Sequence, residues 1–134
     1  MSTGKISLEH VRVKEAMHAG ILAVTSGTPL RTVARQMAEN HVHAIAVVER
    51  DRAVRTVGIV SALDIAAAAA AGVEPTAGEV AASGVITVSA GDRLDHAARL
   101  MAEHHVAHLV VLDRASGHPI GILSALDIAA AYGG

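Results

Sequence analysis

The sequence predicts an α+β fold in which two copies of one β-α-β-β-α unit pack about a pseudo-twofold axis. The first observation is a repeat: Thr28–Arg50 is similar to Asp92–Arg114 at an offset of 64 residues. GIVSALDIAAA from Gly58 returns as GILSALDIAAA from Gly121 at an offset of 63. The second is that short apolar runs alternate with segments of helical periodicity in each copy. The third is size, because a unit of about 60 residues rarely buries enough surface to fold alone.

The first copy opens with a strand and a helix. Ile21–Val24 is a short apolar run and is expected to be a strand. Thr28 and Pro29 then open a helix, in which Thr28 is expected to cap the end and Pro29 to occupy the first turn. One apolar face of this helix is formed by residues at helical spacing, namely Leu30, Val33, Ala34 and Met37.

The same copy continues with a hairpin and a second helix. Ala44–Val48 is a continuous β-prone run, which predicts a buried strand, and Val54–Val60 predicts its partner. The charged residues Glu49–Arg52 between them are expected to form a solvated hairpin tip. Ser61–Ala71 predicts a helix that ends at Gly72.

The repeat also predicts the domain boundaries. A short helix around Val13–Met17 leads into the first copy, and residues 1–12 form an N-terminal extension. Residues 13–72 form repeat one, and residues 73–134 form repeat two, in which residues 73–82 act as a linker.

Composition excludes several classes of function. The 134 residues are 51% hydrophobic and 1% aromatic, contain no cysteine and have a formal net charge of −2. There is no broad positive field and no set of aromatic platforms for nucleic acid. Disulfides and thiolate metal sites are excluded. The polar N-terminus and the short apolar runs predict a cytoplasmic protein that is not inserted in a membrane.

The repeated segment Gly-Ile-(Val/Leu)-Ser-Ala-Leu-Asp-Ile carries the candidate ligand chemistry. It places Ser61 and Asp64, and again Ser124 and Asp127, at the start of a helix directly after a strand. Free N–H groups and a hydroxyl at a helix start suit phosphate, and a carboxylate can accept both hydroxyls of a ribose. The same Ser-x-x-Asp pattern is also a helix capping box, and the two roles are compatible.

Nine histidines raise the question of a metal, with His104, His105 and His108 close together and His41 and His43 near-counterparts. Without cysteine or a His-Glu-x-x-His pattern, no metal site is predicted, and surface histidines at helix ends are the simpler interpretation. A phosphate loop is absent, and no Ser–His–Asp trio can be argued from chain order. The sequence therefore predicts a binding protein and no enzyme.

Taken together, the tandem β-α-β-β-α order, the HVHAIAVVE and HVAHLVVLD segments and the G-h-h-S-x-x-D-h endings resemble the cystathionine-β-synthase (CBS) domain family. The resemblance covers nearly the whole chain, and a pair of such domains is a Bateman module. It implies a regulatory role and binding of an adenosine ligand such as AMP, ADP, ATP, NAD(H) or S-adenosylmethionine in the cleft between the repeats. No other cofactor is expected.

The resemblance also implies the site residues, each site being completed by the other repeat. One site combines the helix start of repeat two with a hydroxyl and a strand-entry segment of repeat one, namely Ser124, Asp127, Thr28, Val42, His43, Ala44 and Ile45. The other combines Ser61, Asp64, Val106, Ala107, His108 and Leu109. In this second site Asp92 takes the place of Thr28 and is expected to repel phosphate. The site around Asp127 is therefore expected to be the better one.

This chain departs from the family pattern at two kinds of position, one on the central strands and one where phosphates are expected to bind. Many family members have proline where this chain has Ala46 and Val110. Phosphates in the family usually meet Arg or Lys, whereas the candidates here are His43 and His108. Because an imidazole ordinarily gains its charge near pH 6.5, affinity for a polyphosphate is expected to be stronger in acid than at neutral pH.

Two further interpretations stay open at the level of sequence. One is a structural or interaction module with empty clefts, in which Asp64 and Asp127 only cap helices. The other is a histidine-based metal-binding protein. A homodimer is expected, because the alanine-rich second helices offer smooth apolar faces and twofold pairing is the commonest assembly. Any regulatory output then passes through an unknown protein effector.

Overall fold

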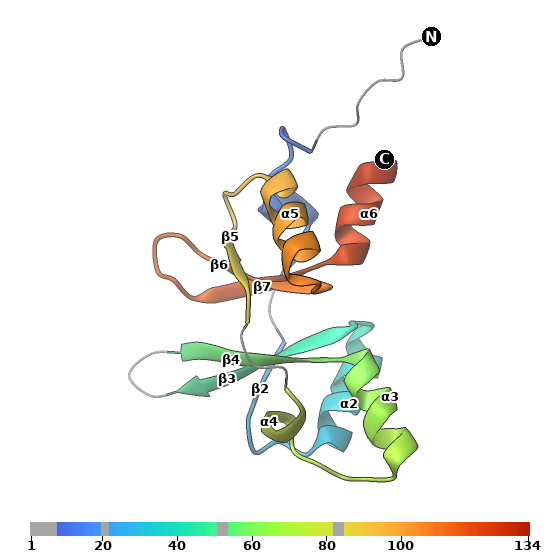
Figure 1. The fold of residues 1–134 in the computed structure, drawn as a ribbon. Coiled ribbons are helices and arrows are strands. Elements are labelled where there is room, and N and C mark those ends of the chain that lie inside the picture. Colours follow the sequence, from blue (N-terminus) through green and yellow to red (C-terminus); the bar gives the residue numbers. More distant parts are fainter. Residues whose placement is uncertain (1–7, 20–21, 51–53, 82–84) are drawn as a thin grey trace. The chain divides into compact units, whose positions relative to one another are not determined.

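The computed structural model describes residues 8–19, 22–50, 54–81 and 85–134. The chain divides into two compact units. The central unit spans Ile21–Val85, and the terminal unit combines Met1–Gly20 with Ile86–Gly134. Each unit is a small mixed sheet with helices on one face (Figure 1). No helix in the described ranges is both long and apolar enough to cross a membrane.

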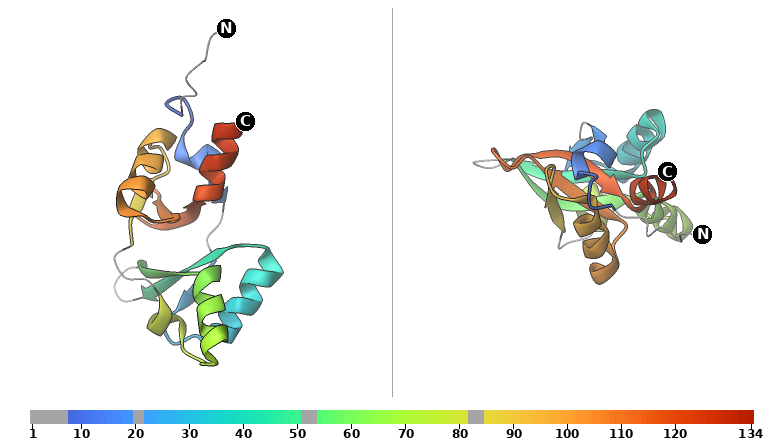
Figure 2. Two further views of the ribbon diagram at one scale, coloured as in Figure 1. Left: turned by 45° about the vertical axis from the view of Figure 1, so that its right-hand side comes forward. Right: turned by 90° about the horizontal axis from the view of Figure 1, so that it is seen from above.

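The central unit contains a three-stranded sheet in the order β2-β3-β4. Its elements, in chain order, are β2 (Ala23–Thr25), α2 (Leu30–Asn40), β3 (Ala44–Arg50), β4 (Val54–Ser61), α3 (Ala62–Ala71) and α4 (Ala77–Val80). β2 runs parallel to β3, and β4 runs antiparallel to β3. Figure 2 shows α2 and α3 side by side on one face of this sheet.

The terminal unit contains a four-stranded sheet in the order β1-β7-β6-β5. Its elements are α1 (Val13–Ala16), β1 (His18–Ala19), β5 (Thr87–Ser89), α5 (Leu94–His104), β6 (His108–Leu112), β7 (Pro119–Ser124) and α6 (Ala125–Gly133). β5 runs parallel to β6, as β2 does to β3, and β1 adds a short antiparallel strand to β7. The predicted strand and helix order is thus confirmed in both copies.

The two sheets repeat one another down to a local irregularity. In the central hairpin Val47 faces Gly58 and Val48 faces Thr56, so one residue of β4 bulges out. In the terminal hairpin Val111 faces Gly121 and Leu112 faces Pro119 in the same way. A bulge bends and twists a hairpin, so the two hairpins share that local shape.

The two cores use equivalent positions. The central core contains Val24, Leu30, Val33, Met37, Ile45, Val47, Val60, Ala68 and Ala77. The terminal core contains Leu8, Val13, Val88, Leu94, Ala97, Met101, Leu109, Val111 and Leu123. Met37 and Met101 are buried in these cores, as their helical spacing predicts.

Each core is closed by a short helix from outside the main β-α-β-β-α segment of its unit. α1 supplies Val13 to the terminal core and packs against α5 and α6. α4 supplies Ala77, the repeat equivalent of Val13, to the central core and contacts β2 and β4. The segment expected to link the repeats therefore carries a core residue of the central unit.

Two details differ from expectation or fall outside the described residues. Thr28 does not cap α2: the N-cap position is Pro29, and no side chain caps this helix end. The Thr28 hydroxyl instead lies 3.3 Å from the Thr25 hydroxyl, because the turn after β2 brings the two side chains together. Asp51 and Arg52 of the predicted hairpin tip, and Ile21 at the predicted strand start, lie outside the described residues.

Candidate functional site

The helix start in the central unit is a complete capping box. The Asp64 Oδ2 atom accepts hydrogen bonds from the Ser61 backbone N–H at 2.8 Å and from the Ser61 hydroxyl at 3.0 Å. The Asp64 backbone N–H donates to the Ser61 hydroxyl oxygen at 3.4 Å. The Oδ1 atom of Asp64 has no partner among the described residues. Half of this half-buried carboxylate is therefore available to another donor.

The equivalent start of α6 has the same backbone geometry. The Asp127 Oδ2 atom accepts from the Ser124 backbone N–H at 2.8 Å, and the Asp127 N–H donates to the Ser124 hydroxyl oxygen at 3.1 Å. The capping interpretation of both Ser-x-x-Asp segments is thus confirmed. A cap uses one carboxylate oxygen, so capping alone does not occupy the ribose-binding capacity of either aspartate.

A histidine distinguishes the two helix starts. His18, on β1, places its Nδ1 atom 3.2 Å from the Asp127 Oδ1 atom. The Asp127 side chain is 8% exposed, whereas the His18 side chain is 72% exposed. Sequence reasoning missed His18, because its repeat equivalent is Ala82 and nothing in the local pattern marks it. Only the pairing of β1 with β7 brings it to Asp127.

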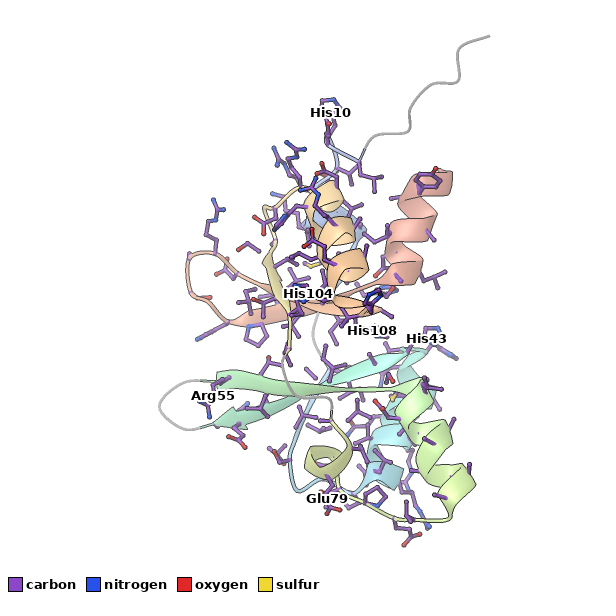
Figure 3. The ribbon with its side chains drawn as sticks, in the orientation of Figure 1. His10, His43, Arg55, Glu79, His104 and His108 are labelled. Carbon is purple, nitrogen blue, oxygen red and sulfur yellow. The ribbon has the colours of Figure 1, made fainter. Side chains whose placement is uncertain are left out.

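The strand-entry segments lie beside the helix start of their own unit. The His43 carbonyl accepts from the Ala62 backbone N–H at 2.9 Å, and the Ala107 carbonyl accepts from the Ala125 N–H at 2.8 Å. Figure 3 shows His43 at the entry to β3 and His108 at the entry to β6. His108 faces Ser124 across the β6–β7 ladder.

The burial of each strand-entry residue decides whether its side chain or only its backbone can contact a ligand. Ala44, Ile45 and Leu109 are buried, so they present backbone and not side chain. Val42 and Val106 are half-buried, and Ala107 is exposed. In the central unit an open cavity of about 470 Å³ runs between the two helices, and it is lined by Ala34, Met37, Ala38, His41, Val42, His43, Ala62 and Ile65.

Thr28 and Asp92 occupy equivalent turns, but their side chains have different partners. The backbone contact is shared, since the Thr28 carbonyl accepts from the Ala77 N–H at 2.8 Å and the Asp92 carbonyl accepts from the Val13 N–H at 2.9 Å. The side chains differ: the half-buried Thr28 places its hydroxyl 3.3 Å from the Thr25 hydroxyl. The Asp92 Oδ2 atom accepts from the Ser89 N–H at 2.9 Å, and its Oδ1 atom lies 3.7 Å from an Arg114 guanidinium nitrogen. The negative charge of Asp92 is thus partly compensated within its own unit.

The histidine cluster is distributed over separate roles. His41 and His105 are the C-cap residues of α2 and α5, and both have φ of 53° in the left-handed region. Histidine is one of the residues that enter this region more often than most. Within the described ranges, no three His, Asp or Glu side chains gather in a group that could hold a metal ion.

Comparison with known proteins assigns the class of this fold and site. The CBS domain family model matches residues 13–71 and 77–134. The chain therefore belongs to the CBS domain family, as a tandem pair of its domains.

Similar solved structures are CBS proteins as well. The chain is 31% identical to the CBS domain protein PAE2072 from Pyrobaculum aerophilum complexed with AMP, over 87% of this chain and 89% of that one, with a TM-score of 0.77. It is 24% identical to the CBS domain pair of protein MJ0100 in complex with 5′-methylthioadenosine and S-adenosyl-L-methionine, over 92% and 96% of the chains, with a TM-score of 0.81. The latter similarity bears on the fold alone.

Two other similar proteins are a structure that contains zinc ions and a longer enzyme. Hypoxic Response Protein I with two coordinated zinc ions is 27% identical over 90% of this chain and 98% of that one, with a TM-score of 0.71. A homoserine O-acetyltransferase from Methanosphaerula palustris is 31% identical over 117 residues, which are 87% of this chain. The chain spans only 23% of the length of that curated relative.

Proposed function

We propose that this chain is a regulatory module that binds an adenosine-type ligand and catalyses no reaction. The carrying observation is the pair of Ser-x-x-Asp helix starts, each beside the strand-entry segment of its own unit. Membership of the CBS family supports the proposal, as does the complex of a 31% identical relative with AMP. The acetyltransferase similarity covers less than a quarter of that enzyme, so its activity is no part of the proposal. Cytoplasmic location remains the sequence prediction.

In the proposed sites, Asp64 and Asp127 accept hydrogen bonds from the ribose hydroxyls of the ligand. A carboxylate oxygen accepts a hydroxyl hydrogen bond, and each cap leaves Oδ1 outside its own hydrogen bonds. Ser61 and Ser124 stand at helix starts, where hydroxyl and backbone donors favour phosphate oxygens. Val42–Ile45 and Val106–Leu109 supply backbone groups for adenine, and Thr28 adds a hydroxyl. The pairing of each helix start with the strand entry of the other repeat stays a prediction of the family resemblance.

His18 acts against the ligand at Asp127. Its Nδ1 atom already occupies the Oδ1 atom that a ribose hydroxyl needs. The ligand therefore shares or displaces a contact at Asp127, whereas Oδ1 of Asp64 is open. We therefore propose that the Asp64 site binds the ligand more tightly. The sequence predicts the reverse order of affinity, because Thr28 belongs to the Asp127 site and Asp92 to the Asp64 site. Removal of His18 is expected to strengthen binding at Asp127.

Calorimetric titration of AMP, ATP, NAD(H) and S-adenosylmethionine tests the proposal. Asp127→Asn and Asp64→Asn retain an oxygen that can accept the cap hydrogen bond but lose the charged acceptor. We expect one of them to weaken binding by about tenfold or more, consistent with loss of a charge-assisted hydrogen bond. His18→Ala is expected to tighten binding in the Asp64→Asn background. Absence of binding by every ligand in the wild type would reject the proposal.

The ligand-free interaction module is the second candidate, because the capping boxes give both aspartates a structural role at their helix starts. It predicts that none of these ligands raises the melting temperature, since only a ligand that binds the folded state stabilises it. The metal-binding alternative is supported by the zinc-containing relative but by no group among the described side chains. Metal analysis of the purified protein decides it.

Self-association is part of the proposal. Leu63 on α3 and Leu126 on α6 occupy equivalent positions and are 77% and 64% exposed. Large exposed apolar side chains at repeated positions favour an interface with a second copy, from which an effector protein would sense the ligand. Light scattering is expected to show a dimer in the wild type and a monomer in the Leu63→Glu/Leu126→Glu double variant. A wild-type monomer at high concentration would contradict this assignment.

A further inference from the structure

The terminal unit contains an open cavity of about 720 Å³ that is lined mainly by cationic side chains. They are Arg12 and Lys14 from the N-terminal segment, Arg93 and Arg99 from the region of α5, and Arg114 from the loop after β6. Figure 3 shows nitrogen-tipped side chains gathered around the start of α5. The cavity lies entirely within one unit, and Asp92, the counterpart of Thr28, is the one lining residue that the sequence also places at an adenosine site.

The charge in this cavity opposes that of the whole chain. Its lining contains five Arg and Lys side chains against Asp92 and Asp95, an excess of three positive charges, whereas the chain carries a net charge of −2. The Lys14 side chain has no hydrogen-bond or ion-pair partner among the described residues. The Arg12 guanidinium donates to the Gly91 carbonyl at 3.4 Å, and the Arg12 backbone N–H donates to the Glu15 carboxylate at 3.0 Å. Neither the Lys14 nor the Arg12 side chain forms an ion pair with the two carboxylates of the cavity, Asp92 and Asp95.

Asp95 is the main internal competitor for the guanidinium groups. It accepts from the Arg93 Nε atom at 2.9 Å and lies 3.8 Å from an Arg99 nitrogen. The hydrogen bond from Arg93 lowers the pKa of Asp95 to about 2, so this carboxylate stays charged at physiological pH. An anion that enters the cavity therefore competes with Asp95 for Arg93 and Arg99.

The central unit shows that the fold does not require these cations. At the positions equivalent to Arg12, Lys14 and Arg93 it has Thr76, Gly78 and Pro29, although its helix and turn have the same geometry. The backbone contact is also shared, since the Lys14 N–H donates to the Ala90 carbonyl as the Gly78 N–H does to the Ser26 carbonyl. The three extra cations are a property of the terminal unit alone.

We propose that this cavity binds a small polyphosphate-bearing anion, at a site separate from the adenosine site. Guanidinium groups bind phosphate in a bidentate geometry, and four arginines and a lysine line this one cavity, so they can engage more than one phosphate group. A chain of two or three phosphates, free or attached to a nucleoside, has the charge and length to span them. The cavity volume, many times that of one water molecule at about 30 Å³, accommodates such a chain.

Titration calorimetry with sodium tripolyphosphate tests the proposal. In the variant Arg12→Thr/Lys14→Gln, Arg12 is replaced by the residue type of its central-unit counterpart Thr76, and Lys14 is replaced by a neutral side chain. This variant is expected to bind tripolyphosphate about tenfold more weakly. Arg35→Gln/Arg50→Gln removes the same charge from the central unit and is the matched control, expected to bind as the wild type does. Asp95→Asn frees Arg93 and Arg99 and is expected to tighten binding.

The outcomes separate this site from the adenosine site. Asp127→Asn and Asp64→Asn are expected to leave tripolyphosphate affinity unchanged, and Arg12→Thr/Lys14→Gln is expected to leave AMP affinity unchanged. A weaker ATP affinity in the latter variant would show that a nucleotide tail is one source of the phosphates. Equal weakening by the matched control, or no binding of tripolyphosphate by the wild type, would overturn the proposal.

Discussion

The start of α3 and the start of α6 have nearly the same backbone but different surroundings. Both are capping boxes in which a serine and an aspartate satisfy each other. Asp64 leaves Oδ1 open, whereas Asp127 is deeper and has His18 at 3.2 Å. The difference arises from the N-terminal segment, which gives the terminal unit β1 and His18. The repeat thus shares the local geometry, and the N-terminal segment changes the surroundings of one of its two aspartates.

The largest expected effects test whether the two cores are equivalent. Ile45 and Leu109 occupy the same position and are fully buried. Truncation of either to alanine is expected to lower the free energy of unfolding by about 2–5 kcal/mol, from lost burial and the remaining cavity. Urea denaturation followed by circular dichroism measures both. A difference of several kcal/mol between the variants would break the equivalence.

A smaller effect tests the strand that only the terminal sheet contains. A Cβ atom at Gly121 would lie 2.7 Å from the His18 carbonyl oxygen and 3.1 Å from the Met17 Sδ atom. Gly121→Ala is therefore expected to cost about 1–3 kcal/mol and to displace β1. Gly27→Ala is the control, because nothing lies within 4 Å of its added Cβ. A neutral Gly121→Ala variant would mean that β1 pairs only weakly.

Removal of either serine cap is expected to change the free energy of unfolding by about 1 kcal/mol. Ser61→Ala and Ser124→Ala each remove a hydroxyl that accepts the aspartate N–H, and each is expected to lower stability by about 0.5–2 kcal/mol. Both hydroxyls accept the aspartate N–H, but the Ser61 hydroxyl also donates to the Asp64 Oδ2 atom at 3.0 Å, so the loss at Ser61 is expected to be equal or larger. If Ser124→Ala has no effect on thermal unfolding while Ser61→Ala does, the His18 contact holds the start of α6 without its cap.

The smallest expected effect is a gain in stability, from replacing a left-handed histidine by glycine. His41 and His105 both adopt φ of 53°, a conformation that costs a side-chain-bearing residue free energy and suits glycine. His41→Gly and His105→Gly are each expected to stabilise by about 0.5–1 kcal/mol, as at other left-handed helix C-caps. A loss of stability in either variant would indicate that the imidazole makes a favourable contact at that helix end. The melting temperature measures the outcome.

The predictions from sequence succeeded where the signal was local. Ser61, Gly72 and the apolar run between them define α3 almost to the residue, because caps and propensity act within a few positions. Thr28 was the exception, since a hydroxyl near a helix start caps it only if the chain turns at that residue, and here the turn is at Pro29. α4 was missed although Glu79 and Val80 repeat Glu15 and Ala16, because Pro75 and Gly78 favour a loop.

The sequence by itself determined the duplication, the order of elements, the Ser61 and Ser124 caps and the family, since all of these depend on pattern along the chain. Only the tertiary structure decided that Val13 and Ala77 close the two cores, that His18 meets Asp127, and that five cations line one cavity. These contacts join segments that lie far apart along the chain. The physical reason is that strand pairing and core packing, which no local pattern records, bring such segments together.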